Sequence, residues 1–207
     1  MRTRIIAVLS LVLMFSCQLK TQQTESNQKE KPTEIEVVNK GNLPFDNYFK
    51  NKTMRVDFFH TGNLKEEMFA VDKVLSDGEW AGSKTILIDK LELGPYFFEV
   101  IDKESKILLF SRGFANIFGE WQTTPEAAEQ WGTFHESIRF PWPLKPVTVV
   151  VKKRDAENKF KQIWNTEIDP SYRQVNPVDR VHFEKVDQII VNGSASEKLD
   201  IVILGDG

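Results

Sequence analysis

The pair His135-Glu136 is the feature of this sequence that most resembles catalytic chemistry, because nowhere else does a glutamate follow a histidine. A zinc peptidase of the H-E-x-x-H type needs a second histidine one helical turn later, so that two imidazoles bind one metal ion. Here Arg139 occupies that position, and the surrounding pattern is typical of a strand. The sequence therefore predicts that His135 and Glu136 form hydrogen bonds on a strand or at its edge, without a zinc ion.

Other polar residues give weaker signals. A Ser-His-Asp arrangement is compatible with the composition, but the chain has no nucleophile elbow and no phosphate-binding glycine loop. Asp206 lies between two glycines after an apolar run, where α/β enzymes place functional carboxylates; a turn-stabilising aspartate explains it equally well. The basic run 152–154 is followed at once by acidic residues, which favours a solvated hairpin tip. With a net charge of −3, nucleic acid is not expected as a partner.

Aromatic residues cluster between positions 111 and 143, where Trp121, Trp131, Phe134 and Trp142 are found. These rings could form an exposed platform for a glycan or a protein, but we favour the explanation that they fill the core and fasten a long loop. The candidate binding or interdomain residues of the chain are therefore Trp121, Trp131, His135, Glu136, Arg139, Trp142 and Asp206.

Short alternating segments separated by turn residues dominate the region that carries these residues. Strands are predicted at 53–60, 85–89 and 134–140, the last closed by Pro141, and hairpins at 96–101 with 107–111 and at 147–152 with 160–166. Residues 64–75 fit a loose helical stripe, with a strand over 68–75 as the alternative, and 181–191 suggest one or two further strands. The pattern predicts a mainly β protein: an antiparallel sandwich, Ig-like or jelly-roll-like, with long aromatic loops.

The N-terminal residues predict export. Arg2 and Arg4 precede an apolar stretch that is too short to span a bilayer, and the stretch ends in a lipobox-like sequence at Cys17, the only cysteine. We expect residues 1–17 to be a lipoprotein signal with Cys17 as the lipid acceptor, and residues 18–45 to be a disordered tether. Gln18 provides no inner-membrane retention signal, so the expected location is the outer membrane, on its periplasmic or cell-surface face.

Several longer motifs resemble one family. They are the runs at 54–62, 93–100, 111–127, 133–143, 147–160 and 199–207, which together resemble the N-terminal domain of the bacterial zinc metallopeptidases named for IgA peptidase, peptidase family M-sixty-four. The resemblance covers roughly residues 50 to 207.

This resemblance implies a β-sandwich accessory domain at 46–192, followed at 193–207 by a linker and the first strand of an α/β catalytic domain. In the family that catalytic domain supplies the H-E-x-x-H zinc site, and none of its residues has a counterpart in this sequence. The expected partners are therefore the catalytic domain in cis, the membrane through the lipid anchor, and a protein substrate of the parent peptidase. The alternative is a stand-alone lipoprotein that binds a glycan or protein through its aromatic loop.

Overall fold

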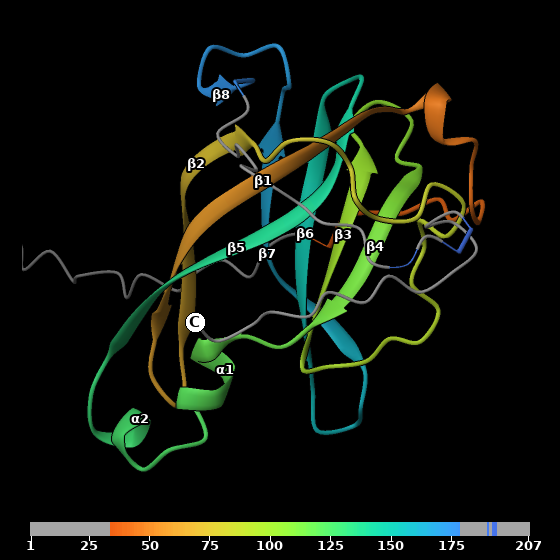
Figure 1. The fold of residues 1–207 in the computed structure, drawn as a ribbon. Helices are drawn as coiled ribbons and strands as arrows, with labels where there is room; N and C mark the ends of the chain where they lie inside the picture. The colour runs from red at the N-terminus through yellow and green to blue at the C-terminus, as the bar shows by residue number, and fades with distance from the viewer. Residues whose placement is uncertain (1–33, 179–189, 191, 194–207) are drawn as a thin grey trace, which may run out of the picture. The chain divides into compact units, whose positions relative to one another are not determined.

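The computed structural model describes residues 34–178, 190 and 192–193, and within them two four-stranded sheets pack face to face (Figure 1). The elements are η1 (Phe45–Asn47), β1 (Phe49–Gly62), β2 (Glu67–Ser76), β3 (Tyr96–Asp102), β4 (Leu108–Phe114), α1 (Ile117–Trp121), α2 (Glu126–Glu129), β5 (Gly132–Pro143), β6 (Val147–Arg154), β7 (Phe160–Ile168) and β8 (Val175–Asn176). One sheet has the order β5-β1-β2-β8 and the other β4-β3-β6-β7. Among these strands only β2 and β8 pair in parallel, so the predicted antiparallel sandwich is confirmed.

The core lies between the two sheets. It is formed by every second side chain of the strands, because alternate residues of a strand face the same side of the sheet. On β1, Met54, Val56 and Phe58 are fully buried, and on β6, Val149 and Val151 are as well. Burying a side chain of this size stabilises a fold by about 1.5–3 kcal/mol. The hairpins β3–β4 and β6–β7 lie where the alternation predicts them.

Strand β5 is longer than predicted, because Pro141 does not end it. The strand continues to Pro143 and pairs with β1 alone, at the edge of its sheet. A proline lacks the amide hydrogen of a ladder bond, and at an edge the unpaired side of the strand needs no such donor. Trp142 lies between the two prolines and is buried in the core.

Two other expectations from the sequence are corrected. Residues 67–76 form strand β2, so the helical interpretation of this segment is wrong and the strand alternative is right. Residues 85–89 are not a strand; Leu87 and Ile88 are buried there, and their amides donate to the Asn42 side chain. The amphipathic spacing in the first case and the short apolar run in the second are each too brief to fix the backbone conformation.

Part of the predicted tether lies against the domain. Ile35 and Val37 pack on a small apolar cluster that includes Ile88 and Leu108, on the outer face of the β4-β3-β6-β7 sheet. Val38 forms an isolated bridge with Ile107. This apolar outer face is thus covered by residues that come directly before the sandwich.

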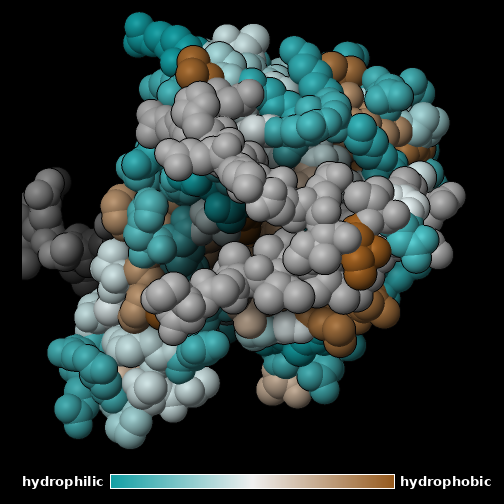
Figure 2. Space-filling model, in the orientation of Figure 1, coloured by the Kyte–Doolittle hydropathy of each residue, from teal (hydrophilic) through white to brown (hydrophobic). Residues whose placement is uncertain are grey.

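Hydrophilic side chains dominate the coloured surface in Figure 2, and apolar side chains are exposed on its right-hand side, where the connection between β2 and β3 runs in Figure 1. Among the described residues, no helix is long and apolar enough to cross a bilayer. Cys17, residues 181–189 and Asp206 lie outside the described residues, and so do the predictions made for them.

Candidate functional site

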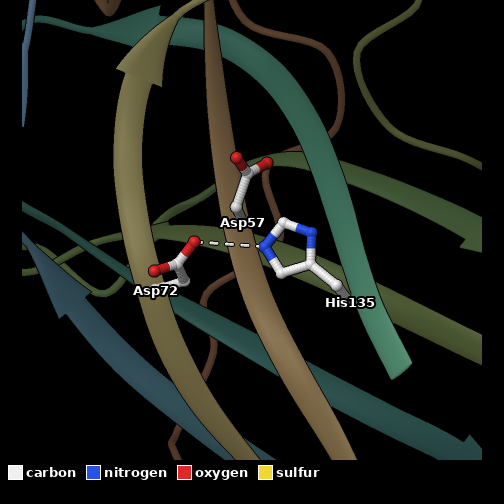
Figure 3. Close-up of side chains that lie close together, drawn as sticks. All are labelled: Asp57, Asp72 and His135. Atoms are coloured by element: carbon white, nitrogen blue, oxygen red, sulfur yellow. Dashed lines mark hydrogen bonds and ion pairs between the residues drawn. The ribbon is translucent and has the colours of Figure 1, made fainter. Parts of the chain in front are cut away.

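Three strands place one histidine and two aspartates together on the outer face of their sheet. Asp57 comes from β1, Asp72 from β2 and His135 from β5, and one ligand atom of each lies within 4.8 Å of the others (Figure 3). His135 Nε2 lies 3.1 Å from Asp72 Oδ2. The pairing of β1 with β2 shifts between Asp57 and Phe58, so Asp72 is an extra residue on β2. This bulge turns the Asp72 carboxylate toward Asp57 and His135. We call these three residues the outer triad.

Cations already neutralise the carboxylates of the outer triad. Arg55 grips Asp57 through two hydrogen bonds, from Nε to Oδ1 at 2.8 Å and from Nη2 to Oδ2 at 3.0 Å. Lys73 Nζ lies 3.2 Å from the same Asp72 oxygen that His135 contacts. A metal ion would have to displace both cations, and bidentate arginine pairs are among the stronger charge-assisted contacts. Within the described part of the chain no other group meets the same ligand geometry.

The ionic contacts continue along this face to Arg139. Its Nε donates to Asp77 Oδ2 at 2.6 Å, and Arg55 Nη1 donates to the other oxygen of the same carboxylate at 3.1 Å. Arg139 also donates to the Ser137 hydroxyl. This candidate residue is therefore part of a surface network of alternating charges, which carries no reactive group of its own.

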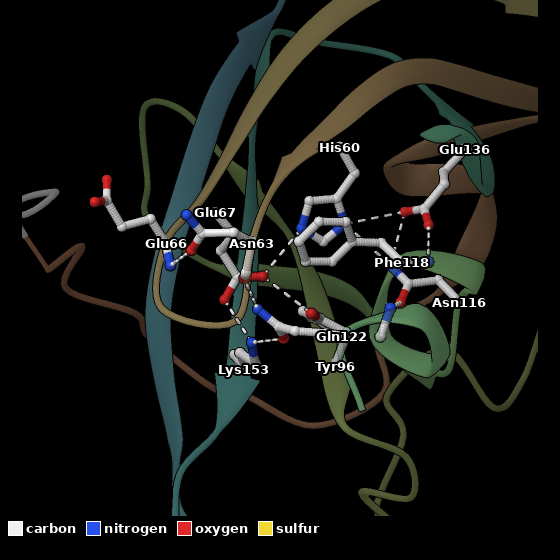
Figure 4. Close-up of polar contacts among 11 residues, drawn as sticks. His60, Asn63, Glu66, Glu67, Tyr96, Asn116, Phe118, Gln122, Glu136 and Lys153 are labelled. Atoms are coloured by element: carbon white, nitrogen blue, oxygen red, sulfur yellow. Dashed lines mark hydrogen bonds and ion pairs between the residues drawn. The ribbon is translucent and has the colours of Figure 1, made fainter. Parts of the chain in front are cut away.

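A second cluster lies on the inner face of the same strands, around His60. Its imidazole is fully buried and is stacked between the rings of Phe69 and Phe118, with centroid distances of 4.0 and 3.7 Å. Nε2 lies 3.0 Å from Glu67 Oε2, and Nδ1 lies 3.2 Å from Glu136 Oε2 (Figure 4). His60, Glu67 and Glu136, which we call the inner triad, come from β1, β2 and β5 respectively.

Glu67 connects the inner triad to the opposite sheet. Its carboxylate accepts hydrogen bonds from the Tyr96 hydroxyl at 2.9 Å and from Lys153 Nζ at 2.7 Å. Although burial raises the pKa of Glu67, the hydrogen bonds from His60, Lys153 and Tyr96 outweigh it and hold the pKa below its ordinary value. Burial, followed by the negative charges of Glu67 and Glu136, raises the pKa of Tyr96. Glu67 is thus an ionised acceptor, and Tyr96 is a neutral donor.

Glu136 fixes the connection between β4 and β5. Its Oε2 accepts a hydrogen bond from Asn116 Nδ2 at 2.7 Å, and its Oε1 accepts one from the Phe118 amide at 3.0 Å. Asn116 is also the N-cap of α1, because its Oδ1 accepts from the Gly119 amide at 2.9 Å. The inner triad therefore holds both sheets and α1 together at one end of the sandwich.

The structure separates the two residues that the sequence presents as a pair. His135 points outward to Asp72, whereas Glu136 points inward to His60, because neighbouring strand residues alternate faces. The two side chains therefore cannot act on one metal ion. The prediction that both residues form hydrogen bonds on a strand or at its edge is confirmed.

The three candidate tryptophans are found in three environments. Trp142 is in the core, and Trp121 is half-buried, with its ring 5.4 Å from that of Phe134. Trp131 comes just before β5 and is 49% exposed. The aromatic cluster is thus divided between core, half-buried loop contacts and one exposed ring.

Sequence reasoning missed His60 and Glu67 as partners. His60 fits the inward phase of β1 together with Val56 and Phe58, and a polar residue in an apolar phase is the signal that would have indicated a buried network. Glu67 gave no comparable signal, because β2 was not securely predicted.

Both triads lie in a region that matches one known family model. Residues 44–165 match the family model described as "Peptidase M64 N-terminus", which is more than half of the chain. No match was found among the curated proteins. The matched range contains both triads and the segment from β4 to β5, and it confirms the resemblance found in the motifs. The chain therefore belongs to the M64 peptidase family, through the N-terminal domain of that family.

Proposed function

We propose that this chain is a non-catalytic accessory domain of a secreted, lipid-anchored zinc metallopeptidase, whose zinc ion and general base belong to a catalytic domain in cis. The observation that supports this most directly is the state of the outer triad. Arg55 and Lys73 already occupy the carboxylates that a metal ion would need. The imidazole of the inner triad is fully buried between two rings, and both of its nitrogens lie within hydrogen-bond distance of carboxylates, so it offers no open coordination position.

The role we assign to the domain is that of a rigid support. The inner triad fastens α1 and the β4–β5 connection to both sheets, so this end of the sandwich presents a fixed surface. Such a surface is suited to docking against the catalytic domain and to shaping access for its protein substrate. A lipid on Cys17 would hold the assembly at the outer membrane.

Zinc content and peptidase activity of this chain alone test the proposal. After incubation with one equivalent of zinc and dialysis, we expect well under 0.1 equivalent to remain bound, and no chelator-sensitive cleavage of casein. Stoichiometric zinc together with chelator-sensitive cleavage would overturn the non-catalytic assignment. His135→Ala is the matched control, because retained zinc that disappears in this variant would be located at the outer triad.

The lipid anchor is tested separately with Cys17→Ser. Cells fed a radioactive fatty acid should label the wild-type chain and leave this variant unlabelled, because the chain contains no other thiol. Labelling of the variant, or its absence in the wild type, would contradict lipidation at Cys17 without affecting the accessory role.

A stand-alone binding module is the second candidate, and the exposed ring of Trp131 favours it. Titration with host glycans or immunoglobulin should then give a saturable fluorescence change that Trp131→Ala removes while the fold is kept. Trp142→Ala is the contrasting variant, because its ring is buried and its loss should affect folding. The absence of any saturable change would leave the accessory domain as the proposal.

A further inference from the structure

We propose that the loop of residues 84–94, which we call the leucine loop, contacts an anionic lipid surface. Three aliphatic side chains of this loop are strongly exposed: Leu91 by 76%, Leu93 by 67% and Ile86 by 56%. Aliphatic residues held in water on one short loop are costly unless something covers them. The inference rests on the lipid anchor of the proposed function, and it assigns a membrane-facing side to the domain.

The backbone of the leucine loop is held rigidly, so the exposure is built into the fold. Asp89 is its centre: one carboxylate oxygen accepts from the Leu91 amide at 2.8 Å, and the other accepts from the Gly113 amide at 2.8 Å. Glu92 adopts φ 50°, a left-handed conformation that is unfavourable for a residue with a side chain. Strain of this kind persists where the surroundings over-determine the backbone, and it recurs at functional loops.

Two arginines hold the loop from its flanks. Arg112 Nη2 donates to the Ile86 carbonyl at 3.2 Å, and Arg154 donates to the carbonyls of Glu92 and Gly94. The backbone of residue 93 lies so close to Gly113 on β4 that a Cβ at that glycine would fall 2.0 Å from the carbonyl oxygen. The loop is therefore fastened along the edge strand of its sheet, and its apolar side chains remain in solvent.

The charge around the loop suits an anionic surface. The loop residues and the two arginines carry four cations, Lys84, Lys90, Arg112 and Arg154, against the two carboxylates of Asp89 and Glu92. Burial raises the pKa of Asp89, but hydrogen bonds from three backbone amides outweigh it and hold the pKa below its usual range. The negative charge of Asp89 is therefore stabilised by backbone amides of the loop and of β4. The whole chain, by contrast, has a net charge of −3. A local cationic excess beside aliphatic side chains is the pattern of interfacial membrane contact.

The position at which the described chain enters the domain agrees with a leucine loop that faces the membrane. Ile35 and Val37 pack on the cluster that contains Ile88, and Asn42 accepts from two amides of the loop itself. The described chain therefore enters the domain on the side that carries the leucine loop. A covalent anchor makes the loop contact intramolecular, so a weak affinity for lipid is enough to orient the domain. Aliphatic composition also favours lipid over a protein partner, whose hot spots are rich in Trp, Tyr and Arg.

The test places one thiol-reactive, environment-sensitive dye on the full lipidated chain in vesicles of phosphatidylglycerol and phosphatidylethanolamine. The variants are Leu91→Cys and, as a control, Ile117→Cys, whose position on α1 is 63% exposed. Because Cys17 is the only natural cysteine and is occupied in the anchored form, each variant has one free thiol. We expect lipids carrying a quencher in the acyl chain to reduce dye emission at position 91 at least about twofold, and to leave position 117 unchanged.

The other outcomes test the loop, its charge and the lipid anchor separately. Absence of quenching at position 91, or equal quenching at both positions, would overturn the inference. Adding Lys90→Glu to Leu91→Cys should weaken quenching at low salt; unchanged quenching would overturn the electrostatic part. A second dye per molecule would reveal a free Cys17, which would contradict the proposed anchor and not the loop. Unchanged urea midpoints would show that the variants are folded.

Discussion

The two triads differ in position more than in chemistry. Each takes one residue from β1, one from β2 and one from β5, and each combines a histidine with two carboxylates. The inner triad is enclosed by aromatic rings, whereas the outer triad lies on the solvent side of the same sheet (Figures 3 and 4). A histidine with neighbouring carboxylates therefore does not define a reactive site by itself.

The contrast teaches that burial determines what such a cluster contributes. Inside the sandwich, Glu67 and Glu136 have exchanged water for protein donors, so the removal of one partner leaves a charge without compensation. Outside, His135 and Asp72 are partly exposed, so water can take the place of either as a partner and Asp72 keeps Lys73, whereas Asp57 is buried and depends on Arg55. We therefore expect the buried His60 to contribute far more to stability than the exposed His135.

The largest expected effect is that of His60→Ala. The substitution leaves a gap between Phe69 and Phe118 and removes a partner from both Glu67 and Glu136. We expect the free energy of unfolding to fall by about 3–5 kcal/mol, as for other broken buried charge networks. Urea unfolding followed by tryptophan fluorescence measures it. A loss below about 1 kcal/mol would remove the distinction between the two triads.

Glu67→Gln should have a smaller effect that depends on pH. At pH 7 we expect a loss of roughly 1.5–3 kcal/mol, because Tyr96 and Lys153 lose a charged acceptor. The pKa of Glu67 is depressed in the folded state, so its contribution is present above the ordinary value of 4.5 and is lost as the pH falls through the folded value. The stability difference between wild type and variant should therefore shrink below about pH 4.5. A difference independent of pH would contradict this.

Arg55→Ala tests the expectation that Arg55 keeps a metal ion away from the outer triad. The change releases Asp57, whose side chain is only 4% exposed, and we expect a loss of roughly 1–2 kcal/mol. It also removes the cation nearest the triad, so calorimetric titration with zinc should show tighter binding than in the wild type. Arg139→Ala is the matched control, because both arginines pair with Asp77, whereas the pair with Asp57 belongs to Arg55. Equal zinc affinity of the wild type and Arg55→Ala would show that Arg55 is not what prevents binding.

The sequence predicted the sandwich because alternation is a local property. The hairpins β3–β4 and β6–β7 follow from it directly, and so does the presence of His135 and Glu136 on a strand. Segment 64–75 was harder because most side chains of β2 are not buried, so its apolar residues do not alternate cleanly. Segment 85–89 was harder because the leucine loop depends on partners far along the chain, Asn42 and Gly113. Local pattern alone cannot supply those partners.

The basic run 152–154 illustrates the same limit for the candidate site. The expectation of a solvated hairpin tip is wrong, because all three residues lie on β6 and each has a different partner. Lys152 contacts Glu99, Lys153 contacts Glu67 in the inner network, and Arg154 holds the leucine loop. Three adjacent residues thus contact three segments that are distant in the sequence, and the spacing of the run does not reveal which segments these are.

His135→Ala should have the smallest effect and completes the comparison with His60→Ala. His135 is nearly half exposed, and Asp72 keeps Lys73 as a partner when the imidazole is removed. The substitution also removes the packing of the imidazole on the ring of Phe59, which lies at a centroid distance of 5.1 Å. Phe59 is itself 42% exposed, so this packing is weak. We therefore expect no resolvable change in the urea midpoint when it is measured under the same conditions as the midpoint of His60→Ala. A destabilisation comparable to that of His60→Ala would mean that exposure does not separate the two triads, and that the outer one is also part of the fold's support.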